Sequence, residues 1–320
     1  MQRVGGAQRK GGSSVGPDEL FQRAVIARRY YFEGRTRIQI AEEFGMSRFK
    51  VTRMLDEAIE SGMVEIKIHN PGSIDVELST ALQKRYGLEH AYAVAGETTN
   101  PADRIDAVAK AMAELLQSIL RDGDVIGVDC GRTLTHIAPH LTSLPRCDVV
   151  QLTGMAGAIT SSGADLVRRI SEVSGGKAWP LYAPLVVPDA RTAESLRQNR
   201  QIRETVAHHE EVSCAIVSVG AWLPGRSQVH QLLSEAEAAT LDAAGVVAET
   251  CALLLDDQGH RVAGLDERRM GIDDTVLRAI PTRIALSTGP DKIAATRAVL
   301  RSGLVSSLVT DTDIAAAVLD

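Results

Sequence analysis

Three cations and two hydroxyl side chains lie within seven residues of the sequence, and side chains of these types bind DNA phosphates and base edges. They are Ser47, Arg48, Lys50, Thr52 and Arg53. Arginine and lysine pair with guanine, whereas serine and threonine hydroxyls bond to bases or to phosphates. Each residue taken singly also fits a solvated helix face, so the interpretation depends on the elements that position the group.

The residues around this group predict a helix-turn-helix. A short helix capped by Thr36 is followed by a second helix that Ser47 opens, and both residues are favourable N-caps. Gly45 permits the tight turn between the helices, and Ala41 is small where they approach each other. The apolar residues spaced to form the shared core are Ile40, Phe44, Met46, Val51 and Met54. A plain helical hairpin is the alternative interpretation.

In a helix-turn-helix, the N-terminal half of the second helix enters the major groove. We therefore expect Arg48 and Lys50 to face base edges, and Ser47 and Arg53 to contact phosphates. Gln39 on the preceding helix is a further candidate phosphate contact. The candidate DNA-binding residues are thus Gln39, Ser47, Arg48, Lys50, Thr52 and Arg53.

An aromatic residue, Phe49, interrupts this polar run. In one interpretation its ring touches a thymine methyl group in the major groove. In the other interpretation the ring packs against the helix that precedes the helix-turn-helix. The sequence leaves both interpretations open.

The length of 320 residues suits a small domain joined to a larger one, because domains cluster near about 100–200 residues. We expect a disordered arm at 1–17, a DNA-binding domain at 18–70, a linker with a bridging helix at 71–88, and an effector domain at 89–320. Within the second part, apolar spacing from Asp18 predicts a first helix that Gly34 ends. The alternating run Val64–Ile68 predicts a strand before the breaker at residues 70–72.

Beyond Leu88 the sequence alternates short β runs with helical segments. Strands are expected at 91–95, 125–129, 149–153, 215–219, 246–255, 284–287 and 307–310, and helices at 101–121, 166–173, 235–244, 291–301 and 313–319. Repeated β-α-β units favour an α/β fold with a mostly parallel sheet covered on both faces. A ligand of such a sheet is expected at the carboxyl ends of its strands.

Charge and composition narrow the function classes. Residues 1–70 hold 12 Lys and Arg against 9 Asp and Glu, whereas the remaining residues hold 23 against 32. A slightly basic module joined to an acidic one fits a chain of which only one end meets a polyanion. We expect a cytoplasmic protein, because the sequence has neither a membrane-spanning apolar stretch nor a signal peptide. The widely spaced cysteines indicate reduced core thiols, and we expect neither a metal nor a cofactor.

Short motifs follow one another in a fixed order through the chain. They are Val64–Pro71, Ile126–Leu134, Gln151–Gly154, Ala183–Leu185, Val247–Glu249, Lys292–Ala298 and Gly303–Asp311. Their order resembles the SorC-type family of sugar-responsive bacterial transcriptional regulators, over almost the whole chain after Asp18. The resemblance implies operator DNA as a partner, and a C-terminal fold like that of ribose-5-phosphate isomerase and glucosamine-6-phosphate isomerase, used for sensing.

A loop after one expected strand has the chemistry of a phosphate site. Gly131, Arg132 and Thr133 offer backbone N–H groups, a guanidinium and a hydroxyl at the start of a helix that begins near Leu134. The resemblance places Gly154, Glu249 and Lys292 around the same pocket, and Asp189 is a further candidate. The candidate effector-binding residues are thus Gly131, Arg132, Thr133, Leu134, Gly154, Asp189, Glu249 and Lys292.

The sequence departs from the family where Asp129 and Cys130 precede this loop, a place where an aromatic residue is common. If Asp129 faced the loop it would repel a phosphate, so a phosphorylated sugar and a neutral sugar or polyol both stay open. His208 and His209, in a polar helix, are expected to be solvated.

Two function classes are compatible with these motifs. One is a regulator whose effector changes its DNA affinity; the other is a sugar-phosphate isomerase fused to a DNA-binding module. Isomerisation needs a positioned general base, and the sequence offers only Glu249 and a few dispersed aspartates. A homodimer or homotetramer is expected, because one small helix-turn-helix reads few base pairs.

Overall fold

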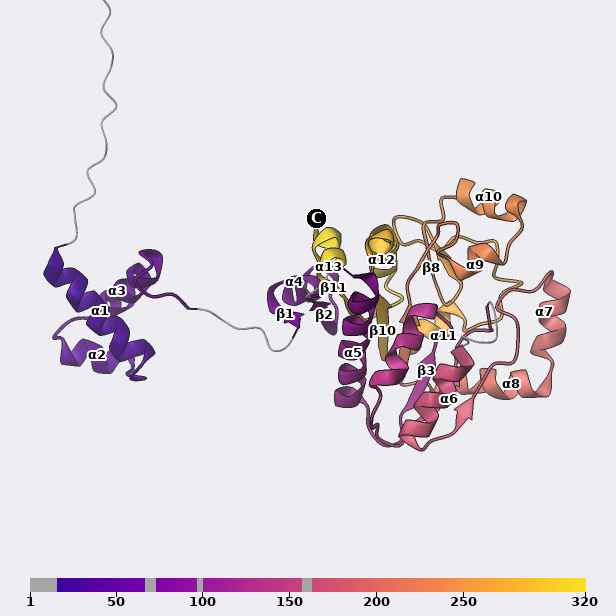
Figure 1. Cartoon of the computed structure of the whole chain (residues 1–320), viewed down its shortest axis with the longest axis horizontal. Coiled ribbons are helices and arrows are strands. Elements are labelled where there is room, and N and C mark those ends of the chain that lie inside the picture. Colours follow the sequence, from indigo (N-terminus) through magenta and orange to yellow (C-terminus); the bar gives the residue numbers. More distant parts are fainter. Residues whose placement is uncertain (1–15, 67–72, 97–99, 157–162) are drawn as a thin grey trace, which may run out of the picture. The chain divides into compact units, whose positions relative to one another are not determined.

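The computed structural model describes residues 16–66, 73–96, 100–156 and 163–320, and the chain divides into two units, Met1–His69 and Asn70–Asp320. The first unit contains the three expected helices (Figure 1). They are α1 (Pro17–Tyr31), α2 (Arg37–Glu43) and α3 (Arg48–Glu60). Of the arm expected at 1–17, residues 1–15 lie outside the described residues, and Pro17 already opens α1.

Local sequence accounts for the ends of these helices. Thr36 and Gln39 form a capping box at the start of α2, and the Ser47 hydroxyl accepts the Lys50 N–H at 3.2 Å at the start of α3. Gly45 has a φ of +60° in the turn between them, a conformation that glycine adopts without steric cost. The core consists of buried residues with Phe44 and Met46 packed against them: Ile26, Ala27, Ile40, Ala41, Val51, Met54, Leu55 and Ala58.

The strand expected at Val64–Ile68 is wrong for the residues that the structure describes, because residues 64–66 are not extended into a sheet. Val64 instead packs against the helical core, and its N–H donates to the Ala58 carbonyl at 2.9 Å. A strand needs a partner for its backbone groups. Residues 67 and 68 lie outside the described residues.

The second unit is built on an eight-stranded sheet in the order β1-β2-β11-β10-β6-β3-β4-β5. Its pairings are parallel except that of β1 with β2. The strands are β1 (Ile74–Asp75), β2 (His90–Val94), β3 (Val125–Val128), β4 (Asp148–Gln151), β5 (Ala178–Trp179), β6 (Cys214–Ser218), β10 (Thr282–Ser287) and β11 (Ser307–Asp311). The expected mostly parallel α/β fold is confirmed.

Helices cover both faces of this sheet, as Figure 1 shows. One face packs on α5 (Pro101–Ile119), the 3₁₀ helix η1 (Arg132–His140) and α6 (Gly163–Ser174). The other packs on α4 (Val76–Tyr86), α12 (Ile293–Ser302), α13 (Thr312–Leu319) and the small sheet described below. Successive residues of β6 point to opposite faces, so the sheet is apolar on both sides.

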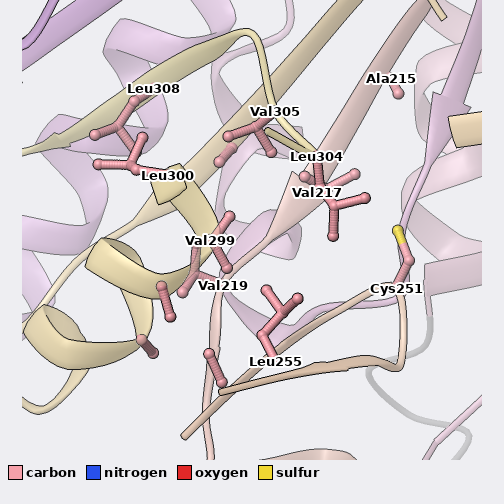
Figure 2. Close-up of a cluster of buried hydrophobic side chains, with 14 of the residues drawn as sticks. Ala215, Val217, Val219, Cys251, Leu255, Val299, Leu300, Leu304, Val305 and Leu308 are labelled. Carbon is pink, nitrogen blue, oxygen red and sulfur yellow. The ribbon is translucent and has the colours of Figure 1, made fainter. Parts of the chain in front are cut away.

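Figure 2 shows the second of these cores, where Ala215, Val217 and Val219 meet Val299 and Leu300. These residues come from the segment of β6 and from α12, and all are buried. The packing fixes the N-terminal end of α12 close to the carboxyl ends of the central strands. That placement matters because Lys292 lies at this end of α12.

The single long strand expected at 246–255 is wrong. The structure has a hairpin of β8 (Ala248–Thr250) and β9 (Leu253–Leu255), which pair antiparallel and join β7 (Gly220–Ala221) in a three-stranded sheet. Cys251 and Ala252 form the turn with φ values of +51° and +56°. Neither is a usual residue for left-handed backbone, so an uninterrupted apolar run concealed the turn.

Sequence periodicity did not identify several short helices: α7 (Ala190–Arg197), α8 (Arg200–Ala207), α9 (Gln228–Gln231) and α11 (Asp274–Ala279). The 3₁₀ helices η3 (His208–Glu211) and η4 (Pro290–Lys292) were not identified either, whereas α10 (Glu235–Ala243) confirms the helix expected at 235–244. The expected solvation of the two histidines is wrong for His209, which is buried and whose ring nitrogen lies 3.0 Å from the Gln151 carbonyl oxygen. Burial lowers the pKa of His209, and His208 stacks on Trp179.

Candidate functional site

The first candidate site is the exposed face of α3. Arg48, Lys50 and Arg53 are exposed there, and Thr52 is half-buried with its hydroxyl donating to the Arg48 carbonyl at 3.0 Å. Ser47 is exposed, and its hydroxyl oxygen accepts the N-cap hydrogen bond of α3. Gln39 is also exposed, although its side-chain oxygen accepts the Thr36 N–H at 2.9 Å. The cations predicted for DNA binding are therefore accessible, and two of the polar candidates also cap helices.

Phe49 lies among these cations and is 72% exposed. The interpretation in which its ring packs against α1 is therefore wrong. The Arg48 guanidinium lies over the ring, 5.0 Å from the ring centroid. Such a contact is a cation–π interaction.

The second candidate site lies at the carboxyl ends of β3, β6 and β10. Lys292 Nζ donates to the Thr133 hydroxyl at 3.0 Å, which joins two predicted residues that are 159 positions apart in the sequence. Thr133 belongs to η1, directly after β3, and Lys292 ends η4, after β10. The parallel sheet brings the two loops together because β6 pairs with both strands.

Glu249 is buried in this site, and Lys292 is half-buried. Burial lowers the pKa of Lys292 to about 8, and the neighbouring Glu249 carboxylate opposes that shift. Burial also raises the pKa of Glu249 to about 7, with the nearby Asp129 charge adding to the rise. Glu249 and Lys292 therefore change protonation close to neutral pH, unlike ordinary surface groups.

The Glu249 side chain fills the space next to Gly220, which has no side chain of its own. An ideal Cβ atom on Gly220 would lie 2.0 Å from Glu249 Oε1, and the two residues are paired in the register of β7 with β8. The Ala252 N–H and the Ser227 hydroxyl both act to lower the pKa of Glu249 and so oppose part of its rise. The left-handed turn after β8 thus lies beside the Glu249 carboxylate.

Asp129 faces the sheet and does not project at the Gly131–Thr133 loop. Its Oδ1 accepts the Cys130 N–H and the Thr153 hydroxyl, both at 2.8 Å. Its Oδ2 accepts the Ser218 hydroxyl at 2.7 Å and the Ser218 N–H at 3.1 Å. The carboxylate therefore links the ends of β3, β4 and β6, and its lone pairs are engaged in that role.

Two residues that sequence reasoning missed surround the loop. The Arg226 carbonyl accepts a hydrogen bond from Arg132 Nη2 at 2.7 Å, and the Arg226 guanidinium pairs with Asp291 at 2.6 Å. Ser218 is a further missed residue, since an ideal Cβ atom on Gly131 would lie 2.0 Å from its hydroxyl oxygen. The only sequence feature that could have predicted Ser218 as a site residue is its position at the carboxyl end of an expected strand.

The structure gives different surroundings to the other predicted effector residues, Leu134, Gly154 and Asp189. Leu134 packs in the core under η1, and its N–H donates to the Gly131 carbonyl at 3.0 Å. Gly154 makes a close backbone approach, because a Cβ atom there would lie 2.5 Å from the Pro184 carbonyl oxygen. Asp189 is exposed and caps α7 by accepting the Thr192 N–H at 2.7 Å, a bond that lowers the pKa of Asp189. The structure thus gives Leu134 and Asp189 structural contacts of their own.

A cavity of about 280 Å³ lies elsewhere, lined in part by His209, Val212 and Ile280. These residues precede β6 and β10, so the cavity is at the opposite ends of these strands from the Thr133–Lys292 contact. At the carboxyl ends, by contrast, the charges of Glu249 and Lys292 lie close to the missing side chains of Gly131 and Gly220.

Membrane-spanning helices and metal-ligand clusters are both absent among the residues that the structure describes. None of the helices in that part of the chain is both long and apolar enough to span a membrane. Within the same part, three or more His, Cys, Asp or Glu side chains do not come together as a metal site would require. The four cysteines are buried.

The fold and the two sites define a class of protein in which a helix-turn-helix is joined to an α/β unit with a buried polar site. A family model described as "Putative sugar-binding domain" matches residues 71–320. Because the match covers well over half of the chain, the chain belongs to this sugar-binding family of SorC-type regulators. The resemblance inferred from the sequence motifs is confirmed.

Individual relatives are similar over nearly their whole lengths. Transcriptional regulator LsrR of Klebsiella pneumoniae subsp. pneumoniae is 26% identical over 324 residues, covering 99% of this chain and 98% of the relative. Transcriptional regulator LsrR of Escherichia coli strain K12 is 24% identical over 313 residues, covering 96% and 97%. The crystal structure of the full-length sorbitol operon regulator SorC from Klebsiella pneumoniae has a TM-score of 0.73 at 21% identity, covering 95% of this chain and all of that one. The fold is therefore shared with SorC.

Proposed function

We propose that this chain is a DNA-binding transcriptional regulator whose affinity for its operator is controlled by a small sugar effector. The observation that carries the proposal is the partly buried contact of Lys292 with Thr133 beside the buried Glu249, in a chain that elsewhere exposes a cationic helix. Hydroxyl, ammonium and carboxylate groups bind the hydroxyls and anionic groups of a sugar. The relatives named transcriptional regulator LsrR support the same function.

The effector is a phosphorylated sugar in this proposal. The carboxylate of Asp129 accepts hydrogen bonds from Ser218 and Thr153 in the sheet, so its lone pairs are occupied, and its charge attracts the Lys292 ammonium. Arg132, Thr133 and Lys292 then present two cations and a hydroxyl around the start of η1. Glu249 would accept hydroxyl groups of the sugar.

In this proposal the chain senses its sugar without converting it. One observation favours an isomerase instead: burial raises the pKa of Glu249 to about 7, which suits a general base. Incubation of the protein with pentose and hexose phosphates, followed by chromatography, separates the two functions. Turnover that is lost in Glu249→Gln would support the isomerase.

The division of labour follows the sequence. Residues 18–70 would bind DNA, 71–88 would link the domains, and 89–320 would bind the effector. The regulator would work in the cytoplasm as a homodimer or homotetramer on a pseudo-palindromic operator, because two half-sites give the specificity that one small module lacks.

A thermal-shift screen of sugar phosphates, sugars and polyols tests the proposal. A ligand at about 100 times its dissociation constant stabilises the native state by about 2.7 kcal/mol. The same ligand should change the affinity of the full-length protein for DNA in a gel-shift titration. Stabilisation without any change in DNA affinity would contradict control by the effector.

A further inference from the structure

The position of Phe49 on α3 is opposite to the core. Val51, Met54, Leu55 and Ala58 are the buried residues of this helix, so they define its inward face. At about 100° per residue, Phe49 projects from the outward face. Its ring is thus presented to whatever the helix contacts.

The surroundings of Phe49 are cationic. Arg48 stacks on its ring, and Lys50 and Arg53 are exposed beside it on the N-terminal half of α3. The acidic residues of the helix, Asp56 among them, follow in its C-terminal half. A partner with an apolar surface would have to bury these cations, whereas a polyanion with a small apolar group would satisfy both the charges and the ring.

The major groove of DNA offers that combination. Thymine carries a methyl group at C5 on the floor of the groove, and guanine presents N7 and O6 to a bidentate arginine. Because Arg48 and Phe49 are in contact, the bases that they touch must be neighbours. Phosphates on both sides of the groove meet the remaining cations.

We propose that Arg48 and Phe49 act as one reading unit for a thymine next to a guanine, with Phe49 on the thymine methyl and Arg48 on the guanine. This inference rests on the proposed DNA-binding function and names the bases that the helix reads. Phe49 is the residue that would distinguish thymine from cytosine or uracil at this step, since only the methyl group offers it an apolar contact.

The test uses the full-length protein and duplex DNA that the protein itself selects from a random-sequence pool. Each thymine in the selected site is replaced in turn by deoxyuridine, which removes the methyl group and keeps the base pair. One replacement next to a guanine should weaken binding about fourfold, the value for burying one methyl-sized group. Replacing that guanine by 7-deazaguanine should weaken binding about tenfold.

Phe49→Ala should bind the thymine and deoxyuridine duplexes equally, and circular dichroism should show an unchanged fold because the side chain is exposed. Phe32→Ala is the matched control, since Phe32 is 88% exposed and lies outside α3. This control should keep the fourfold preference for thymine.

The outcomes separate this inference from the function on which it rests. If the parent protein selects a site but is indifferent to every thymine methyl, the reading unit is wrong and DNA binding stands. If Phe49→Ala keeps the preference for thymine, another residue reads the methyl group and the inference again fails. If the full-length protein selects no sequence at all, the proposed function fails as well.

Discussion

The exposed face of α3 and the Thr133–Lys292 site use charged side chains in opposite ways. Arg48 and Lys50 are exposed on α3. Lys292 is half-buried and Glu249 is buried, and their pKa values lie at about 8 and about 7 because withdrawal from water penalises their charged forms. The charges on α3 are therefore hydrated in the free protein. At the second site, the protonation of Glu249 and that of Lys292 depend on each other.

This difference predicts different responses to mutation. Exposed cations act nearly independently and are screened by salt. Buried polar groups that share hydrogen bonds are coupled, so removing one leaves the others unpaired. The predictions below test this contrast.

The largest effect is expected for Asp129→Ala. The substitution leaves the Thr153 hydroxyl and the hydroxyl and N–H of Ser218 without this acceptor, whereas the Cys130 N–H still donates to Thr153 Oγ1. The unfolding free energy of the second unit should fall by about 3 kcal/mol or more, since each unpaired buried group costs about 1–3 kcal/mol. Urea denaturation measures it, with Glu114→Ala on the exposed face of α5 as the control. A loss below about 1 kcal/mol would show that water replaces the carboxylate.

Arg48→Ala and Lys50→Ala should each weaken operator binding by about 1–3 kcal/mol, the value of one base-reading contact. Because both side chains are exposed, the unfolding free energy should change by less than about 0.5 kcal/mol. Gel-shift titration at two salt concentrations and thermal unfolding give the two values. Unchanged affinity in both variants would remove the assignment of α3 as the recognition helix.

Thr133→Ala and Lys292→Ala should separate effector response from DNA binding. Each removes one partner of the 3.0 Å contact at the effector site. The variants should bind operator DNA as the parent does but need effector concentrations at least about tenfold higher, which corresponds to about 1.4 kcal/mol. Lys292→Met, which keeps the length of the side chain, separates loss of charge from loss of volume. A parental effector response in all three variants would place the ligand elsewhere.

Stability should also depend on pH, with a gradual change per pH unit. The folded pKa of Glu249 is raised to about 7, so the folded state binds the extra proton and its stabilising effect is lost as pH rises from about 4.5 through 7. The folded pKa of Lys292 is lowered to about 8, so its contribution is present above about 10.5 and is lost as pH falls through 8. Each slope is at most about 1.4 kcal/mol per pH unit.

The pH effect of Glu249 is measured as a difference between two proteins. Burial lowers the pKa of His209, which gives a slope of opposite sign below about 6.5 in both of them. The contribution of His209 is therefore the same in the parent and in Glu249→Gln. The difference between their unfolding free energies should change between pH 4.5 and 7 only because Glu249 titrates. Parallel curves over this range would show that Glu249 titrates normally.

The sequence by itself determined the helix-turn-helix. Thr36 and Ser47 cap α2 and α3, Gly45 takes the left-handed turn, and the spacing of Ile40 and Val51 builds the core. All these signals act within a few residues of one another, so they can be recognised without the fold. The exposed cations follow directly from which residues are turned inward.

The sequence also predicted the mostly parallel sheet and named Thr133 and Lys292, through the loop chemistry and the family motifs. It could not predict that the two side chains meet, because the contact depends on the order in which β3, β6 and β10 pair. The hairpin turn at Cys251 was hidden for a similar reason, since its left-handed backbone is imposed by tertiary packing and not by residue type.

Only the tertiary structure decided what Asp129 does. Its carboxylate could have faced the loop and repelled a phosphate, but Ser218 and Thr153 from neighbouring strands turn it into the sheet. The pKa values of Glu249 and Lys292 likewise come from burial, a property of the assembled core. Local spacing determines a helix and its caps, whereas the direction and protonation of a buried charge depend on partners that the chain brings from far away.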